Sequence, residues 1–207
     1  PGDINVDVQL LVLTDTATPG ASMVFDGPGA TTTLSGDEIR TGVPSIFSDN
    51  VVVSNDVRLD TTNAGGVPAG ALIDLRGTVD ADATELTLTI DAGSNGDVDF
   101  DGEVGNSAGL EPLHNLVIEE AQDVTFDGAT KSGDIDVQIA RDVTLGDGIG
   151  PDPIELLILP GTPASTGTLK IGNADPTLAG DAPITGTVTA NGSVSARQMN
   201  IAADVLI

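Results

Sequence analysis

The sequence contains no cysteine, no tryptophan and no tyrosine, and it has only four phenylalanines and one histidine. Without cysteine, the chain has no disulfides, no thiolate zinc ligands and no thiol nucleophile. With so few aromatic rings, a core must be built mainly from Val, Ile, Leu and Ala. The lone histidine, His114, lacks the Gly-x-Ser-x-Gly motif of a common nucleophilic triad, and we expect it to lie in a turn or loop. These absences argue against nucleophilic catalysis and against a disulfide-stapled scaffold.

Positive charge is scarce too. The chain has 7 Lys and Arg residues against 32 Asp and Glu residues, which gives a formal net charge of -25 at pH 7. Such an acidic surface repels nucleic acid and anionic membranes, and it attracts cations. In addition, no apolar run approaches the roughly 20 residues that span a bilayer. We therefore expect neither a nucleic-acid partner nor insertion into a membrane.

The residues that are abundant favour turns and strands. Of the acids, 25 are Asp and 7 are Glu, and they are accompanied by 26 Gly and 12 Pro. Asp, Gly and Pro suit turns and strand ends, whereas Glu prefers helices. We find no convincing helix in the sequence, and the apolar residues are too many and too evenly spread for a disordered chain. The composition therefore predicts an all-β protein.

One short phrase recurs along the chain: apolar, polar, apolar, Asp, Gly. Three of the four phenylalanines precede an Asp-Gly pair, at Phe25, Phe100 and Phe126. A phrase that recurs at intervals of about 16 to 34 residues is typical of the coils of a solenoid. Later and more decayed copies are TLKIGN (168–173) and TVTANG (187–192). We predict a core ladder that takes one residue from each well-formed copy, namely Phe25, Leu59, Leu75, Phe100, Phe126 and Leu145.

Within a copy of the phrase, polar and apolar residues alternate as they do in a half-buried strand. In DVTFD, Val124 and Phe126 share one face, while Asp123, Thr125 and Asp127 share the other. We expect the phenylalanine to point into the core and the Asp residues to face water. We expect the following Asp-Gly pair to turn the chain, with the glycine supplying a positive φ.

Two other strand types accompany the phrase. Apolar strands precede it at 86–90 and 113–120, and short stretches follow it at 77–79 and 102–104. Coils of this kind predict a right-handed parallel β-helix with irregular coils of about 16 to 34 residues, in which residues 1–207 form one β-solenoid domain. The alternative is a β-sandwich of the donor-strand type, which also has short strands at regular spacing.

Two long phrases, LTLTIDAGSNGDVDFDGEVG (86–105) and LHNLVIEEAQDVTFDGAT (113–130), resemble the coils of filamentous-haemagglutinin-like proteins. That family belongs to the giant β-strand-repeat surface proteins of bacteria, and the resemblance is best over residues 70–150. It implies an extracellular or cell-surface fibre or adhesin made of parallel β-helix. The Asn-Pro-Asn motifs that usually mark the family's secretion domain do not occur in this sequence, which implies a shaft rather than a secretion domain.

Parallel β-helices also include polysaccharide lyases and hydrolases, whose sites combine acids with Arg or Lys on one exposed face. Here Arg58 and Arg76 occupy comparable positions in neighbouring copies, and Asp56, Asp60 and Asp74 lie near them in the sequence. Two of these acids could supply the carboxylate pair of glycoside hydrolysis. The other reading is that the two cations relieve repulsion among the acids. We expect no enzyme and no catalytic residues, with a β-helix lyase or hydrolase as an alternative.

Calcium binding is a stronger functional hypothesis for this sequence than glycoside hydrolysis. Asp97, Asp99 and Asp101 alternate along one strand and so project from one face. Residues 93–102 resemble the Gly-Gly-x-Gly-x-Asp repeat that binds calcium in β-rolls, although the repeat is not in tandem here. Residues 146–152 offer a second acidic loop, with no Glu to complete an EF-hand. The alternative is a solvated acidic face that keeps the protein soluble, and we expect no other cofactor.

Both ends of the sequence are apolar strands without polar caps, at 4–14 and 199–207. Strand edges without caps pair with other copies by β-augmentation, and heterologous contacts of this kind generate open filaments. We therefore expect a structural subunit or segment of an extracellular bacterial fibre or surface adhesin, which assembles head-to-tail with copies of itself. The alternative is an adhesin module that binds a glycan or a host surface. The predicted interface residues are Ile4, Val6, Val8, Leu10, Val12, Ile201, Val205 and Ile207.

Overall fold

The structure, a computed structural model, is all-β. Within its described residues all regular secondary structure is strand, none is helix, and every pair of named strands is parallel. The prediction of an all-β class is confirmed. The alternative β-sandwich does not fit, because the strands of a sandwich pair antiparallel. The described residues are 4–6, 10–13, 21–26, 31–146, 153–157, 159–161, 163–172, 187–201 and 204–206.

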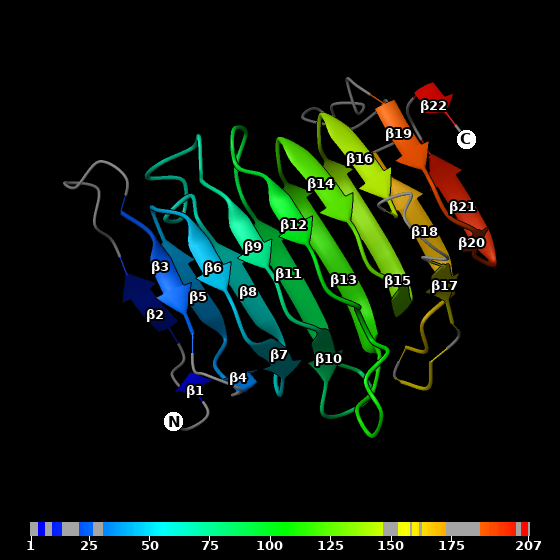
Figure 1. The fold of residues 1–207 in the computed structure, drawn as a ribbon, viewed down its shortest axis with the longest axis horizontal. Helices are drawn as coiled ribbons and strands as arrows, with labels where there is room; N and C mark the ends of the chain where they lie inside the picture. Colours follow the sequence, from blue (N-terminus) through cyan, green and yellow to red (C-terminus); the bar gives the residue numbers. More distant parts are fainter. Residues whose placement is uncertain are drawn as a thin grey trace.

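The chain visits three parallel sheets in turn, and the strands of each sheet follow one another along the long axis of the molecule (Figure 1). β1 lies in the first sheet, β2 in the second and β3 in the third, and this order recurs from β4 to β12. Each sheet is open rather than closed on itself. The first sheet contains β1 (Ile4–Val6), β4 (Thr31–Leu34), β7 (Asn50–Val53) and β10 (Val79–Ala81).

The other two sheets are longer. The second sheet contains β2 (Leu10–Leu13), β5 (Glu38–Thr41), β8 (Val57–Asp60), β11 (Thr87–Asp91), β13 (Leu113–Glu120), β15 (Thr130–Ile139), β17 (Ile154–Leu156), β18 (Thr168–Ile171), β20 (Val194–Ser195) and β21 (Gln198–Ile201). The third sheet contains β3 (Met23–Phe25), β6 (Ser45–Phe47), β9 (Ile73–Leu75), β12 (Val98–Phe100), β14 (Asp123–Phe126), β16 (Asp142–Leu145), β19 (Thr187–Ala190) and β22 (Asp204–Leu206).

The ten-residue strand β15 joins the row of strands that begins in the first sheet to the row of the second sheet. Its first residues pair with β17, and its later residues pair with β18. Isolated parallel bridges connect Thr130 in β15 to Val104, and Val104 to Val79 in β10. The row of strands that begins in the first sheet therefore continues through Val104 into β15, β17 and β20.

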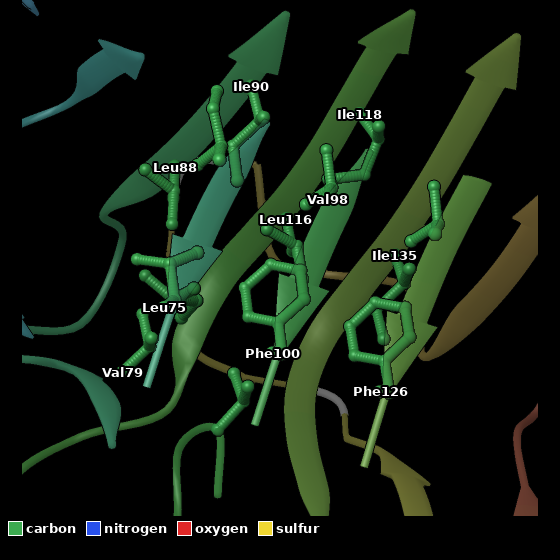
Figure 2. Close-up of a cluster of buried hydrophobic side chains, with 14 of the residues drawn as sticks. Leu75, Val79, Leu88, Ile90, Val98, Phe100, Leu116, Ile118, Phe126 and Ile135 are labelled. Carbon is green, nitrogen blue, oxygen red and sulfur yellow. The ribbon is translucent and has the colours of Figure 1, made fainter. Parts of the chain in front are cut away.

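The core lies between the sheets and is made of the residues that alternate inward along each strand. In β14, Val124 and Phe126 are buried, while Asp123 and Thr125 are half-buried. This is the alternation expected of a strand with one dry face and one wet face. Figure 2 shows the inward side chains of neighbouring strands packed together, among them Phe100 and Phe126.

The phenylalanines form a column along the third sheet, in register from strand to strand. The rings of Phe25 and Phe47 are stacked with centroids 4.5 Å apart, and those of Phe100 and Phe126 with centroids 4.8 Å apart. Aromatic pairs in this range of distance attract one another beyond the area that they bury. The sheet register places Phe25, Phe47, Leu75, Phe100, Phe126, Leu145 and Ala190 in one column.

One residue of the predicted ladder, and one of the decayed copies of the phrase, belong to another sheet than expected. Leu59 is buried, but it lies in β8 of the second sheet, between Ile39 and Ile90, and Phe47 occupies its expected place. Likewise, Thr168–Ile171 of TLKIGN form β18 of the second sheet, and the matching strand of the third sheet is β19, formed by Thr187–Ala190 of TVTANG. The error has a physical cause: strands of every sheet alternate in the same way, so the local pattern does not say to which sheet a strand belongs.

The glycines at the corners after β9, β12 and β14 serve a purpose other than the one predicted for the Asp-Gly pairs. Gly77, Gly102 and Gly128 do not have a positive φ. Instead, a Cβ atom on Gly102 would lie 2.3 Å from the carbonyl oxygen of Gly77, and one on Gly128 would lie 2.6 Å from that of Gly102. The corners of successive coils therefore stack backbone against backbone, and only glycine permits that approach.

Candidate functional site

Five Asp residues gather on the outer side of the third sheet, and we call them the acidic face: Asp74, Asp97, Asp99, Asp101 and Asp127. Asp99 lies beside Asp74 in the sheet register, and Asp97 and Asp101 flank it along the chain. The inward neighbours of Asp99, Val98 and Phe100, are fully buried, so that Asp99 is directed outward. The structure thus brings together the three residues predicted to bind calcium, and it adds two from neighbouring strands.

Partial burial and the crowding of like charges both change the protonation of this face. Partial burial, together with the charges of Asp97, Asp74, Asp101 and Asp127, raises the pKa of Asp99 to about 6. Repulsion of this kind favours whatever neutralises the carboxylates, either a proton or a cation.

Two arginines neutralise part of the surrounding charge. Arg76 Nε lies 2.8 Å from Asp74 Oδ2, while the other oxygen of Asp74 is buried without a hydrogen-bond partner. Arg141 pairs with Asp123 and also with Asp142, at 3.1 Å. Among the residues that the structure describes, no three His, Asp or Glu side chains converge closely enough to hold a metal ion. The second acidic loop considered for calcium, at 146–152, lies outside the described residues except for Gly146.

The second sheet carries a different polar group on its outer side, centred on Arg58. Its guanidinium contacts Asp60 at 2.9 Å, Asp91 at 2.6 Å, Glu119 at 2.6 Å and Glu38 at 3.3 Å. These acids come from β5, β8, β11 and β13, so one cation ties four successive strands together. We call these five residues the Arg58 network.

One carboxylate of the Arg58 network, that of Asp60, is wholly buried and fixed in place by hydrogen bonds. The Asp60 side chain has no exposed area, and its Oδ1 accepts hydrogen bonds of 2.6 Å from both the backbone N–H and the hydroxyl of Thr62. Burial acts to raise the pKa of Asp60, but these hydrogen bonds, one from Ala64 and the charge of Arg58 outweigh it and lower the pKa. For Arg58, burial acts to lower the pKa, and the contacts with Glu119, Asp60 and Asp91 reverse that effect and raise it.

The five residues considered for glycoside hydrolysis do not form one site. Arg58 and Asp60 belong to the second sheet, whereas Arg76 and Asp74 belong to the third sheet and its following corner. Asp56 accepts a hydrogen bond of 2.8 Å from the backbone N–H of Thr87.

His114 was expected in a turn or loop, and this expectation is wrong. It is the second residue of β13, and it is 6% exposed. Its Nε2 lies 3.1 Å from the carbonyl oxygen of Pro163, and a Cβ atom on Gly161 would lie 2.7 Å from its ring. The chain between β17 and β18 therefore covers the imidazole, a contact between residues far apart in sequence that a local pattern does not reveal.

The predicted interface residues that the structure describes lie at the two ends of the stack of strands. Val6 is buried, Ile4 and Ile201 are half-buried, and Leu10, Val12 and Val205 belong to β2 and β22 by their backbone. Val8 and Ile207 lie outside the described residues. At the end formed by β19, β20 and β21 there is an apolar hollow of about 170 Å³, and Met199, which lines it, is 45% exposed.

Comparison of the chain with protein families, with curated proteins and with solved structures returned no match. Among the described residues there is no helix with the length and apolarity needed to cross a bilayer.

Proposed function

We propose that the three sheets are the faces of a right-handed parallel β-helix, and that the chain is a structural subunit or segment of an extracellular bacterial fibre or surface adhesin. The handedness follows the strong preference of parallel crossover connections for the right-handed form. The extracellular and bacterial part of the proposal is supported by the resemblance of residues 86–105 and 113–130 to coils of giant surface proteins.

One observation carries the proposal: the same arrangement recurs from one coil to the next. From β1 to β12 the chain returns to the three sheets in the same order, every pair of named strands in the described residues is parallel, and the inward column of Phe and Leu keeps its register. In a stack of this kind each coil contacts only its neighbours, and length is added without a change of core. Such a construction suits a rod whose task is to span distance.

We propose further that copies associate head-to-tail. β1, β2 and β3 present one strand of each sheet at one end of the stack. At the other end, β20 ends the row that continues from the first sheet, β21 ends the second sheet and β22 ends the third. A parallel edge accepts a further parallel strand, and a second copy offers three in the matching order. The contact is heterologous, so it repeats without closing. The half-buried Ile4 and the exposed Met199 supply apolar area on the two sides.

Calcium at Asp97, Asp99 and Asp101 remains a second part of the proposal. It is supported by the raised pKa of Asp99, to which partial burial contributes most and the charges of the neighbouring carboxylates add. A divalent cation relieves this repulsion, and carboxylate oxygens are the ligands that calcium prefers. Calcium should therefore raise the melting temperature of the protein, and a chelator should reverse the rise. A melting temperature that responds to neither reagent would contradict this part.

Electron microscopy of the purified chain tests the structural role. We expect filaments whose width is that of one stack, and we expect the substitution Met199→Arg to shorten or abolish them, because it places a charge in the apolar end. Ala83→Arg is the matched control, since Ala83 is exposed and lies between β10 and β11, in the middle of the stack and away from both ends. A monodisperse monomer that binds a glycan would favour the adhesin-module alternative. A monomer that depolymerises acidic polysaccharide would favour the lyase or hydrolase.

A further inference from the structure

The sequence contains two Asn-Gly pairs, and both lie at corners of the fold. Asn95-Gly96 lies between β11 and β12, and Asn191-Gly192 lies between β19 and β20. In an unstructured peptide, Asn followed by Gly loses its side-chain amide readily, because glycine has no side chain to hinder the reaction. We propose that Asn191 is a site of spontaneous deamidation in the folded protein, and that the fold protects Asn95 from the same reaction.

The reaction needs only water. The backbone nitrogen of Gly192 attacks Cγ of Asn191, the Cγ–Nδ2 bond breaks, and ammonia leaves with the proton from the attacking nitrogen. The product is a five-membered succinimide. Water then adds to one of its two carbonyl carbons and opens the ring to Asp or to isoaspartate. The sum is one water consumed and one ammonia released, with no change of oxidation state.

At the corner of Asn95, hydrogen bonds and packing restrain the groups that would have to react. The Gly96 N–H donates a 3.3 Å hydrogen bond to the carbonyl oxygen of Gly93, and the Asn95 N–H donates a 2.8 Å bond to that of Ala69. Gly96 is also packed tightly, because a Cβ atom there would lie 2.1 Å from the carbonyl oxygen of Ala92. Ring closure requires the backbone to rotate and the Gly96 nitrogen to be free. This corner must open before either can happen.

The corner at Asn191 restrains the asparagine in the same way but not the glycine that follows it. The Asn191 N–H donates a 2.8 Å hydrogen bond to the carbonyl oxygen of Leu145, as the Asn95 N–H does to that of Ala69. Asn191 is exposed and Gly192 is half-buried, and within the described part of the chain no atom accepts a hydrogen bond from the Gly192 N–H. Gly192 also lines the apolar hollow of about 170 Å³ and is therefore not packed on that side. Both Asn side chains are exposed, so exposure does not distinguish the two sites. The difference is the freedom of the glycine that follows.

Deamidation at Asn191 would weaken the last coils. The Asn191 side chain donates a 2.8 Å hydrogen bond from Nδ2 to the carbonyl oxygen of Gly146, which joins this corner to the equivalent corner of β16. The product carboxylate has no hydrogen to donate and faces that oxygen with a negative charge. In isoaspartate the main chain is also longer by one carbon, which disturbs the pairing of β19 and β20 with their neighbours. The modification would thus destabilise one end of the stack and not the other. This inference does not depend on whether the chain forms a fibre.

The test is peptide mapping by mass spectrometry after incubation of the purified chain at mildly alkaline pH, with Asn, Asp and isoaspartate forms separated. In the folded protein, we expect Asn191 to convert roughly tenfold faster than Asn95. Gly96 must leave its hydrogen bond and its tight packing before its nitrogen can attack, whereas at Asn191 the side chain must release its bond to Gly146 but the glycine is unhindered. In denaturant the two sites should convert at similar rates. Equal rates in the folded protein, or faster conversion at Asn95, would overturn the proposal.

Two variants sharpen the result. Gly192→Ala adds a side chain next to the attacking nitrogen and should slow conversion at Asn191 while the rate at Asn95 is unchanged. Asn191→Asp imitates one product and should lower the melting temperature of the unincubated protein. If Gly192→Ala converts at the wild-type rate, the succinimide path is excluded. If Asn191→Asp melts at the wild-type temperature, the inferred weakening of the last coils is wrong.

Discussion

The rings of Phe100 and Phe126 are stacked with their centroids 4.8 Å apart and their planes 2° from parallel. This distance is the spacing of neighbouring strands in a sheet, about 4.7–4.9 Å. The ladder of backbone hydrogen bonds therefore sets the distance between the stacked rings, and the rings fill the core at the same spacing as the strands.

Replacing one ring of this column should cost much of the stability. Phe126 is fully buried, and we expect Phe126→Ala to lower the free energy of unfolding by about 3–5 kcal/mol, because it removes apolar area and leaves a cavity. Chemical denaturation measures this change. Thr125→Ala, on the outer side of the same strand, is the control and should have little effect. A loss at Phe126 no larger than that at Thr125 would contradict the inward column.

The corner glycines make a separate prediction. In Gly128→Ala, the new methyl group would lie 2.6 Å from the carbonyl oxygen of Gly102, so the coils must move apart. We expect a loss of about 2–3 kcal/mol in the free energy of unfolding. The control is Gly65→Asn, because Gly65 has a φ of +79° and nothing within 4 Å of its Cβ position, and Asn tolerates that conformation. If both variants unfold at the same denaturant concentration as the wild type, backbone stacking at the corners is not what requires glycine.

The Arg58 network should behave as a unit that depends on its cation. Arg58→Met removes the closest positive partner of the wholly buried Asp60 carboxylate and leaves only Arg40, at 3.6 Å, at a cost of about 2–3 kcal/mol. Lys131→Met removes a looser pair, in which Nζ lies 4.0 Å from Glu155, and should change stability little. Thermal and chemical unfolding of the two variants at equal ionic strength compare these effects. An Arg58→Met protein as stable as the Lys131→Met protein would show that the network does not stabilise the fold.

The acidic face makes a prediction about pH. The pKa of Asp99 is raised from 3.8 to about 6, so between these values the folded protein keeps a proton that the unfolded chain has released. Through this group, the free energy of unfolding therefore falls as pH rises through that window. Asp99→Asn should stabilise the protein above the window by about 1 kcal/mol, after allowance for solvent screening, and should give no gain below it. Denaturation curves at several pH values check this. A gain that is the same at every pH would contradict the titration of Asp99.

Much of the local structure could be predicted from the residues alone. The alternation in DVTFD places Val124 and Phe126 inward and Asp123 and Thr125 outward, as the burial of β14 shows. The outward grouping of Asp97, Asp99 and Asp101 follows from the same rule. By contrast, Phe47 was missed because its strand is followed by Ser-Asp rather than Asp-Gly.

Other features depend on contacts between distant residues. The Arg58 network joins β5 to β13, and Glu119 enters it where the register between β11 and β13 shifts after Ile90. Nothing in the pattern around Arg58 indicates that shift, because a bulge is set by how two strands fit together. The cover over His114 comes from the chain around Pro163, which lies far away in sequence.

The sequence by itself determined that the chain is all-β, which side of each strand is apolar, and that short strands recur with Asp-Gly corners. These properties are local, since the two-residue period of a strand and the preferences of Asp and Gly act over a few residues. Only the tertiary structure decided which sheet each strand joins, why the corners require glycine, and which carboxylates share a cation. Those outcomes depend on the stacking of one coil on the next, where backbone atoms of Gly77, Gly102 and Gly128 come into contact across residues that the sequence keeps far apart.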